Sequence, residues 1–317
     1  MKFRFALAGL LQAAIALPAI AEQPTFVTVF VDNDWFAHSD RHYTAGSHVA
    51  FARDIDTLSE GIRTLAPFRW ATDRTAVFSI GQRIYTPGNT NPKPEEPLDR
   101  PYAGWIYVQG DVRTQAGPVS ERVSGTIGYI GPGAGGRQVQ RLSHHILGSR
   151  GLDGWGEQLR SEPTLSVAYE RSWPGLVSAG RGIDLSPYVG ATLGTPYTYA
   201  DAGAIARWGR NLPDDLPTAQ ISLGTPRDGY RGTAALGWYA WAGVEARAVG
   251  RNVFLDGSTF RDSQSVDRKT FQYDVALGFV VAWPRVRAGF TMVQRSKEFD
   301  SQISSDRFGQ IAISFAY

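Results

Sequence analysis

The segment TAALGWYAWAGVEARAV (residues 233–249) alternates between two kinds of side chain along its length. Small and apolar residues such as Val244 and Ala246 occupy one set of positions, while Glu245 and Arg247 fall in the other. Such period-two alternation predicts a β-strand whose two faces lie in different environments. The segment is longer than most strands of globular proteins, which have about 3 to 10 residues. Its length favours a strand that crosses a membrane at a tilt.

Similar alternation recurs along the rest of the chain. The other predicted strands lie at 25–31, 46–54, 76–85, 104–113, 121–130, 164–173, 183–194, 199–209, 271–283, 285–296 and 308–317. With the first segment they number about twelve, and an even number is typical of bacterial outer-membrane barrels. In the last strand Ile311, Ile313, Phe315 and Tyr317 share one face, as is usual for the final strand of such a barrel.

The first residues of the chain have the features of an export signal. Lys2 and Arg4 precede an apolar stretch that ends on small residues at 19–21. This pattern predicts a secretory signal peptide over residues 1–21. A membrane anchor is the alternative, but the apolar stretch is shorter than the roughly 20 residues that a helical span needs. We therefore expect residues 22–317 to be exported as a single domain.

The composition of the chain agrees with a membrane barrel. An exported chain without cysteine has no disulfides, so hydrogen-bonded architecture and burial must stabilise its fold. The chain is rich in glycine and in aromatic residues, which gather at both interfaces of a transmembrane barrel. We therefore expect an all-β fold, a transmembrane antiparallel β-barrel of about twelve strands. A β-sandwich in the periplasm or outside the cell has the same alternation, and the pattern alone leaves it open.

Alternating strands would place the polar connections at one end of the barrel. If the mature N-terminus lies in the periplasm, the outward connections are 32–45, 86–101, 131–162, 195–198, 250–266 and 297–307. Two connections at the opposite end, 56–75 and 210–232, are long for a barrel of this kind, and the sequence assigns no role to them.

One outward segment breaks the β pattern. In residues 135–149, Val139, Leu142 and Ile146 recur at helical spacing. We expect a short helix there, on the outer rim of the barrel. On this helix Gln140 and His144 are four residues apart and share a face.

Several chemical motifs are absent from the sequence, which has no Gly-x-Ser-x-Gly elbow, no HExxH and no EF-hand loop. The polar cluster after the first strand combines the oxygen donors Asn33 and Asp34 with the hydroxyl of Thr44. The predicted helix adds an imidazole at His144 or His145. Oxygen donors suit calcium rather than zinc.

Taken one at a time, these residues also have ordinary structural roles. Asn-Asp commonly begins a turn, because both side chains bond their own backbone. The histidines of the chain lie at positions 38, 42, 48, 144 and 145. A single histidine in a loop is more often a solvated residue than a catalyst.

Four longer motifs give a more specific signal: NDWFAHSDRHYTAG (33–46), DRPYAGWIYV (99–108), IGPGAGGRQVQRLSHHILGSRGLDGWGEQL (130–159) and RNVFLDGSTF (251–260). In this order they resemble the successive motifs of the outer-membrane lipid A 3'-O-deacylase family, LpxR. The resemblance covers essentially the whole mature chain. It implies a twelve-stranded barrel in the Gram-negative outer membrane. It also implies calcium-dependent ester hydrolysis that removes the 3'-linked acyloxyacyl chain of lipid A.

The resemblance carries the family's site residues to four positions. Its Asn-Asp pair falls on Asn33 and Asp34, which would hold Ca²⁺. Its threonine in YTAG falls on Thr44, and its histidine four residues after a glutamine falls on His144, which would act as general base. His145 is then only a neighbour. The site would lie on the outer rim, between the barrel wall and the helix, facing the outer leaflet.

The expected partner is lipid A, or the lipopolysaccharide of the outer leaflet, and we expect a membrane-embedded monomer. A net charge of +2 and the absence of a long Lys/Arg run predict no nucleic-acid partner. A second class of function stays open, a non-enzymatic outer-membrane barrel that is a channel or a structural protein.

The chain departs from the family pattern at two charged positions. The best-characterised members carry a Lys-Arg pair in the loop after the third strand, and this loop here reads TPGNTNPKPEEPLDRPY. They also carry an acidic residue six positions beyond the histidine, where this chain has Arg150. Lys93 and Arg100 are the candidates to supply the missing charge.

Overall fold

The computed structural model describes residues 26–37, 42–55, 73–88, 99–147, 154–180, 182–213 and 235–316. The predicted signal peptide lies outside these residues, as do most of the two long connections to which the sequence assigned no role. All the strands of the described chain belong to one antiparallel sheet.

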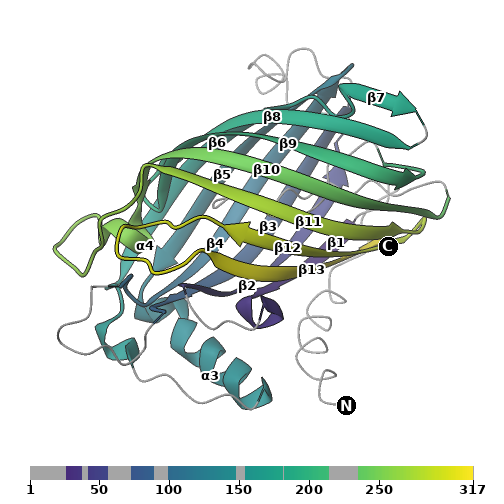
Figure 1. Cartoon of the computed structure of the whole chain (residues 1–317). Coiled ribbons are helices and arrows are strands. Elements are labelled where there is room, and N and C mark those ends of the chain that lie inside the picture. The colour runs from purple at the N-terminus through teal and green to yellow at the C-terminus, as the bar shows by residue number, and fades with distance from the viewer. Residues whose placement is uncertain are drawn as a thin grey trace.

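The sheet closes on itself (Figure 1). The neighbours run in order from β6 back to β1, then from β13 back to β7, and β6 also pairs with β8. This pairing closes a ring of twelve strands, and the short strand β7 (Val177–Gly180) is attached to β8. The predicted barrel of about twelve strands is confirmed, which excludes the β-sandwich. The ring strands are β1 (Phe26–Asn33), β2 (His42–Asp54), β3 (Asp73–Thr86), β4 (Ala103–Ala116), β5 (Val119–Ile130), β6 (Glu162–Ser172), β8 (Ile183–Gly194), β9 (Tyr197–Arg210), β10 (Gly237–Asn252), β11 (Phe271–Ala282), β12 (Val286–Arg295) and β13 (Asp306–Ala316).

One strand boundary differs from the prediction in a way that matters for the site. β1 continues to Asn33 and β2 already begins at His42, so the connection expected over 32–45 is shorter. Thr44 therefore lies in a strand and not in a loop. The register of β2 against β3 shifts across Thr44, which makes this residue the extra residue of a β-bulge.

Short helices occur in the connections at one end of the barrel, the end expected to face outward (the outward end). The predicted rim helix is present as α3 (Gly136–Leu147), which Figure 1 shows outside the ring of strands. The others are η1 (Asp34–Ala37), η3 (Pro132–Ala134), η4 (Gly154–Glu157) and α4 (Val253–Asp256). No helix of the described chain is long and apolar enough to cross a membrane.

The inside of the barrel is filled by aromatic and charged side chains. On β10, Tyr239, Trp241, Glu245 and Arg247 are at most 4% exposed, whereas Val244 on the opposite face is 54% exposed. The alternation seen in the sequence is therefore an alternation between the barrel interior and its outer surface. This arrangement is typical of a transmembrane barrel, whose outer face contacts lipid.

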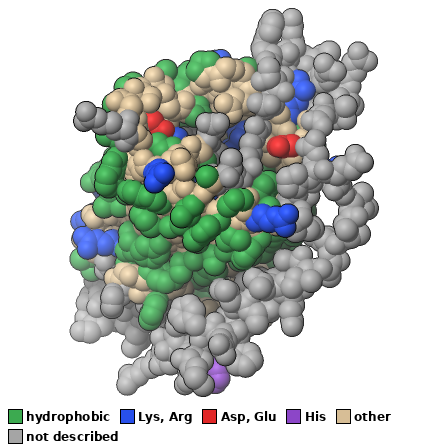
Figure 2. Space-filling model, turned by 90° about the vertical axis from the view of Figure 1, so that its right-hand side faces the viewer, with side chains coloured by type: hydrophobic (Ala, Val, Ile, Leu, Met, Phe, Trp, Pro, Cys, Tyr) green, Lys and Arg blue, Asp and Glu red, His purple; other side chains and the backbone are tan. Residues whose placement is uncertain are grey.

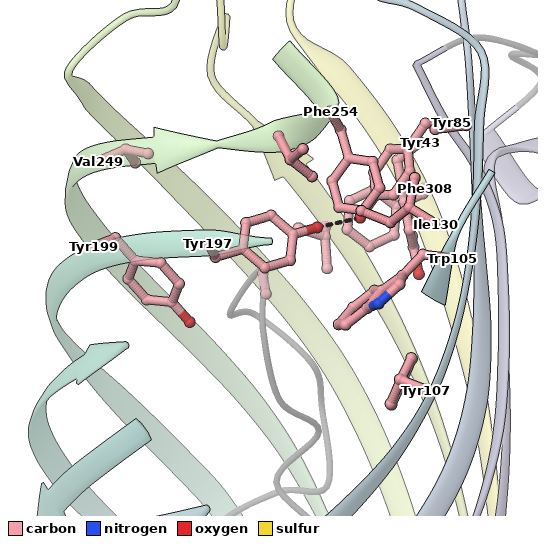
Figure 3. Close-up of a cluster of buried hydrophobic side chains, with 14 of the residues drawn as sticks. Tyr43, Tyr85, Trp105, Tyr107, Ile130, Tyr197, Tyr199, Val249, Phe254 and Phe308 are labelled. Atoms are coloured by element: carbon pink, nitrogen blue, oxygen red, sulfur yellow. Dashed lines mark hydrogen bonds between the residues drawn. The ribbon is translucent and has the colours of Figure 1, made fainter. Parts of the chain in front are cut away.

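Aromatic rings meet across the interior (Figure 3). Tyr85 of β3 and Tyr197 of β9 share a hydrogen bond between their hydroxyls at 2.5 Å. Phe254 of α4 stacks on Tyr85 with the ring centroids 4.1 Å apart. Since β3 and β9 lie far apart around the ring, these contacts span the lumen near its outward end.

The outer surface exposes large apolar side chains. Figure 2 shows a broad area of hydrophobic side chains on one face of the molecule, with charged side chains mainly toward its margins. Strand residues that are more than half exposed include Ile127, Leu165, Val167, Leu193, Val244 and Leu277. An apolar area of this kind would be unfavourable in water and is matched by the acyl chains of a membrane.

Candidate functional site

The first candidate residues lie where β1 ends and β2 begins. Asn33, the last residue of β1, pairs with Ala45 of β2, next to the bulged Thr44. The Thr44 hydroxyl forms a hydrogen bond with the hydroxyl of Thr86 on β3 at 2.6 Å. The structure therefore brings Asn33 and Thr44 to neighbouring positions on adjacent strands.

Asp34 follows directly as the first residue of η1 and is 3% exposed. The side-chain oxygen of Asn33 accepts a hydrogen bond from the backbone N–H of Trp35 at 2.7 Å. This is the turn that an Asn side chain commonly forms with the backbone two residues on. It fixes the Asn33 amide at the point where the chain leaves the strand and turns into η1.

Thr44 and Thr86 lie on the outer face of the barrel wall. Tyr43 and Tyr85, the residues before them, belong to the aromatic cluster inside the barrel (Figure 3). Because successive side chains of a strand point to opposite faces, Ile84 and Thr86 on either side of Tyr85 point outward. Thr44 contacts Thr86, so its hydroxyl also lies on the outer face.

The helix α3 packs against this outer face. Its Val139 contacts an apolar cluster formed by Ile84, Tyr102 and Trp155. The indole N–H of Trp155 also donates a hydrogen bond to the side-chain oxygen of Gln140 at 2.6 Å. The helix is thus held to the wall from β3 and from the segment that follows it in the chain.

Two glycines permit this close packing. A Cβ atom added at Gly104 of β4 would lie 3.0 Å from the Cα and N atoms of Gly136, the first residue of α3. A Cβ atom added at Gly136 would lie 2.7 Å from the ring of Trp155. The backbones of strand and helix therefore approach more closely than side chains at these positions would allow.

α3 brings the fourth candidate residue to the same end of the wall. Ile84, beneath the helix, is two residues from Thr86, the partner of Thr44. Positions 140 and 144 lie one turn apart on the helix, and Gln140 is 4% exposed. Position 144 therefore shares the face of α3 on which Gln140 bonds to Trp155. The His144 side chain is outside what the structure describes.

The structure also shows a buried histidine that the sequence left among loop residues. His42 is 4% exposed, with Nδ1 2.7 Å from Asp306 Oδ1 and Nε2 3.4 Å from Asp99 Oδ1. Burial alone would raise the pKa of Asp99. The hydrogen bond and charge of the His42 ring, with the backbone N–H groups of Arg100 and Gly88, instead hold this pKa below its ordinary value. The place of His42 inside the first motif is the one sequence signal that could have singled it out.

Of the charged residues Lys93, Arg100 and Arg150, at or near the positions that depart from the family pattern, the structure describes only Arg100. Arg100 is fully buried; its guanidinium donates to Glu298 at 3.0 Å and lies 4.7 Å from the centroid of the Tyr85 ring. It therefore belongs to the barrel interior and not to the outer face of the wall. Lys93 and Arg150 lie outside the described residues, and His145 is exposed on α3.

The candidate metal ligands can be compared with what calcium requires. Within the described ranges, no group of three or more His, Asp or Glu side chains is arranged to hold a metal ion. Asn33 and Asp34 offer amide and carboxylate oxygens, which are donors that calcium prefers. Calcium takes about six to eight oxygens, so backbone carbonyls or water would complete its shell. The donor chemistry of the pair fits calcium, with a single carboxylate from these two residues.

Known proteins share this architecture. The family model "Outer membrane protein LpxR" matches residues 5–317. LpxR from Salmonella typhimurium has a TM-score of 0.72 at 24% sequence identity, over 92% of this chain and 99% of that chain. The β domain of the Bordetella autotransporter BrkA is less similar, with a TM-score of 0.45 at 11% identity over 93% and 98% of the two chains.

No curated protein sequence matches this chain. The family model nevertheless spans nearly the whole sequence, and the Salmonella protein shows the same barrel fold. The chain therefore belongs to the LpxR family of outer-membrane proteins.

Proposed function

We propose that this protein is an outer-membrane lipid A deacylase that hydrolyses the ester linking the 3' acyloxyacyl chain to lipid A, with calcium as its cofactor. Membership of the LpxR family supports this activity, and the closed barrel agrees with a place in the Gram-negative outer membrane. One observation carries the proposal to this chain. Asn33 at the end of β1 neighbours the bulged Thr44 of β2, Asp34 follows directly in the chain, and α3 packs against the adjoining strands β3 and β4 at the same end of the barrel.

The outer face of the wall gives a lipid substrate a direct approach. The acyl chains of lipid A lie in the hydrocarbon of the outer leaflet, where they can contact the exposed apolar side chains of the barrel. Their ester linkages lie at the boundary with the head groups. Because Thr44 lies on the outer face and not in the lumen, the ester can meet it from the side without entering the barrel.

His144 would act as the general base. In this mechanism it accepts a proton from a water molecule, and the water oxygen attacks the ester carbonyl carbon without a covalent bond to the enzyme. An unperturbed imidazole has a pKa of about 6.5 and can therefore accept a proton near neutral pH. The Thr44 hydroxyl donates a hydrogen bond toward the oxygen on which negative charge develops. His144 then returns the proton to the leaving alkoxide.

Asn33 and Asp34 would hold the calcium ion through their side-chain oxygens. A bound calcium ion would supply positive charge that stabilises the oxyanion of the ester. The burial of Asp34 strengthens the attraction between its carboxylate and a cation, since water screens the pair less. The turn at Asn33 limits the motion of its amide, which reduces the entropy lost when it binds an ion.

A channel is the alternative from a different class of function. The lumen near the outward end contains Tyr85, Tyr197 and Phe254 in mutual contact, together with further buried aromatic side chains. Water-filled porins instead have an open polar interior. This filling favours the enzyme, whose proposed chemistry takes place on the outside of the wall.

The proposal is tested on lipid A from Gram-negative cells that express the full-length protein, by mass spectrometry, with calcium present and with calcium chelated. The wild type should remove the mass of the 3' acyloxyacyl chain only with calcium. His144→Ala and Asp34→Ala should each reduce this release by about 100-fold or more, because each removes a group that acts on the transition state.

The matched control is His145→Ala, which removes the same residue type from the same helix at an exposed position. It should keep activity within about twofold, since surface substitutions are usually neutral. Urea unfolding of the purified variants checks that the barrel is intact. Retained release in His144→Ala or Asp34→Ala would refute the site. The function would be refuted if the wild type left the mass of lipid A unchanged in cells and the purified protein also left it unchanged in mixed micelles with calcium.

A further inference from the structure

His42 joins three outward segments of the barrel through its ring. The ring lies between the carboxylates of Asp306, at the start of β13, and Asp99, in the connection between β3 and β4. Gln302 also donates to Asp306 at 3.1 Å, so this carboxylate is held from two sides. Two carboxylates beside one imidazole favour the form in which both ring nitrogens donate hydrogen bonds.

The backbone at His42 has a conformation that the ring contacts help to maintain. Its φ is +61°, in the left-handed region that residues other than Gly seldom adopt, although Asn, Asp and His do so more often than most. Two residues later comes the bulge at Thr44. β2 therefore begins with a positive φ at His42 and a bulge at Thr44. The His42 side chain is buried between two carboxylates. Irregular backbone of this kind persists when the surrounding structure holds it in place.

Asp99 and His42 also lie next to the contact between Thr44 and Thr86. His42 lies two residues before Thr44, and Gly88 lies two residues after Thr86. Asp99 contacts both, because it faces the His42 ring and its Oδ2 accepts the backbone N–H of Gly88 at 2.8 Å. The two strands that carry the hydroxyl pair are thus tied together just beyond it.

We propose that His42 is a positioning residue for the deacylation reaction: clamped between Asp99 and Asp306, it holds the bulged start of β2 against the end of β3, so that the Thr44 hydroxyl faces the ester. This inference rests on the proposed function. His42 does not contact the substrate in this role. It acts through Thr44, and its loss should slow the chemical step while binding of the lipid on the outer wall persists.

Glycine and asparagine at position 42 separate the ring from the backbone. His42→Gly keeps the left-handed conformation without strain but removes both ring contacts. His42→Asn tolerates the same conformation and keeps one side-chain donor. The control is Asp184→Asn at the opposite end of the barrel, where Asp184 is buried and accepts two hydrogen bonds from Arg207 at 2.9 and 2.6 Å.

The kinetic test uses full-length protein in mixed micelles with lipid A and saturating calcium. His42→Gly should lower kcat about tenfold or more, since small misplacements of a reacting group have effects of this size, and should change KM less than about twofold. His42→Asn should recover a substantial part of kcat. Asp184→Asn should retain wild-type kcat. A wild-type kcat in His42→Gly, or a loss of kcat of the same size in Asp184→Asn, would overturn the positioning role.

Hydrogen–deuterium exchange supplies a readout that does not depend on activity. In His42→Gly, peptides that contain residues 42–46 and 84–88 should exchange faster, because the carboxylate that accepts the Gly88 N–H loses its contact with the ring. Asp184→Asn should leave these peptides unchanged. If the wild type releases no acyl chain, the proposed function fails. Hydrogen–deuterium exchange then still tests whether His42, through Asp99 and Asp306, holds β2 against β3. Unchanged exchange at 84–88 in His42→Gly would overturn this role of His42.

Discussion

Several charged side chains in the lumen have almost no exposed surface. Asp274 on β11 is fully buried, 2.8 Å from Arg247 and 2.9 Å from Arg295. Arg247 is also 2.8 Å from Glu245. A buried ion costs several kcal/mol of solvation that only close partners offset. The carboxylates of this cluster therefore offset the solvation cost of burying the arginines beside them.

Asp274→Ala should destabilise the barrel strongly because it leaves two buried arginines with one fewer partner. We expect the free energy of unfolding to fall by about 3–5 kcal/mol, measured by urea titration in detergent with tryptophan fluorescence. Asp300→Ala is the control, since Asp300 pairs with Lys269 at 2.6 Å on the surface and is much more exposed. It should cost less than about 1 kcal/mol. Equal effects of the two variants would contradict a special role for buried charge.

At the scale of the element, the strands could be predicted because their two faces differ so strongly. Side chains such as Glu245 and Arg247 point into the lumen, while Val244 points outward. This alternation can be recognised in the sequence of each strand by itself. The helix over 135–149 was likewise predictable from its own spacing, and it is confirmed as α3. Local pattern was enough for these elements because each one needs only its own two faces to be defined.

The bulge and the histidine clamp could not be predicted in this way. Their causes are contacts between residues far apart in sequence, such as His42 with Asp306. The burial of Arg100 could not be predicted for the same reason, because its partner Glu298 is 198 residues away in the sequence. The candidate residues Asn33 and Thr44 came from motif resemblance, and the structure adds that both stand at the outward end of adjacent strands.

The docking of α3 gives a prediction for an element. Gly104→Ala would place a Cβ 3.0 Å from backbone atoms of Gly136, so the helix must move away from the wall by a few tenths of an ångström. We expect the rate of lipid A deacylation to fall about tenfold or more, because His144 moves with the helix. Urea unfolding should show a loss of stability below about 2 kcal/mol, since the barrel strands still pair.

Gly110→Ala is the matched control for this variant. It makes the same change on the same strand β4, at a position where an added Cβ meets no atom within 4 Å. Its deacylation rate should equal that of the wild type. If Gly104→Ala also deacylates at the wild-type rate, the close packing of α3 is not needed for the reaction.

The whole molecule uses the two sides of its wall for different purposes. The interior holds the buried charge cluster and the aromatic contacts (Figure 3), and the exterior carries the apolar surface (Figure 2) and the Thr44 hydroxyl of the candidate site. A channel needs the reverse arrangement, with an open polar path through the ring. The fold class alone therefore does not decide between a channel and an enzyme, whereas the filled ring argues against a channel.

Conductance in planar lipid bilayers tests this division. The purified wild type should give no regular conductance steps under conditions in which a porin does, because Tyr85, Tyr197 and Phe254 close the lumen near its outward end. Phe254→Ala should remain closed, since Tyr85 and Tyr197 still bond across the interior. Regular steps in the wild type would show that water passes these rings. The lumen would then be a path for ions, and the outer wall would no longer be the one surface on which the barrel can act.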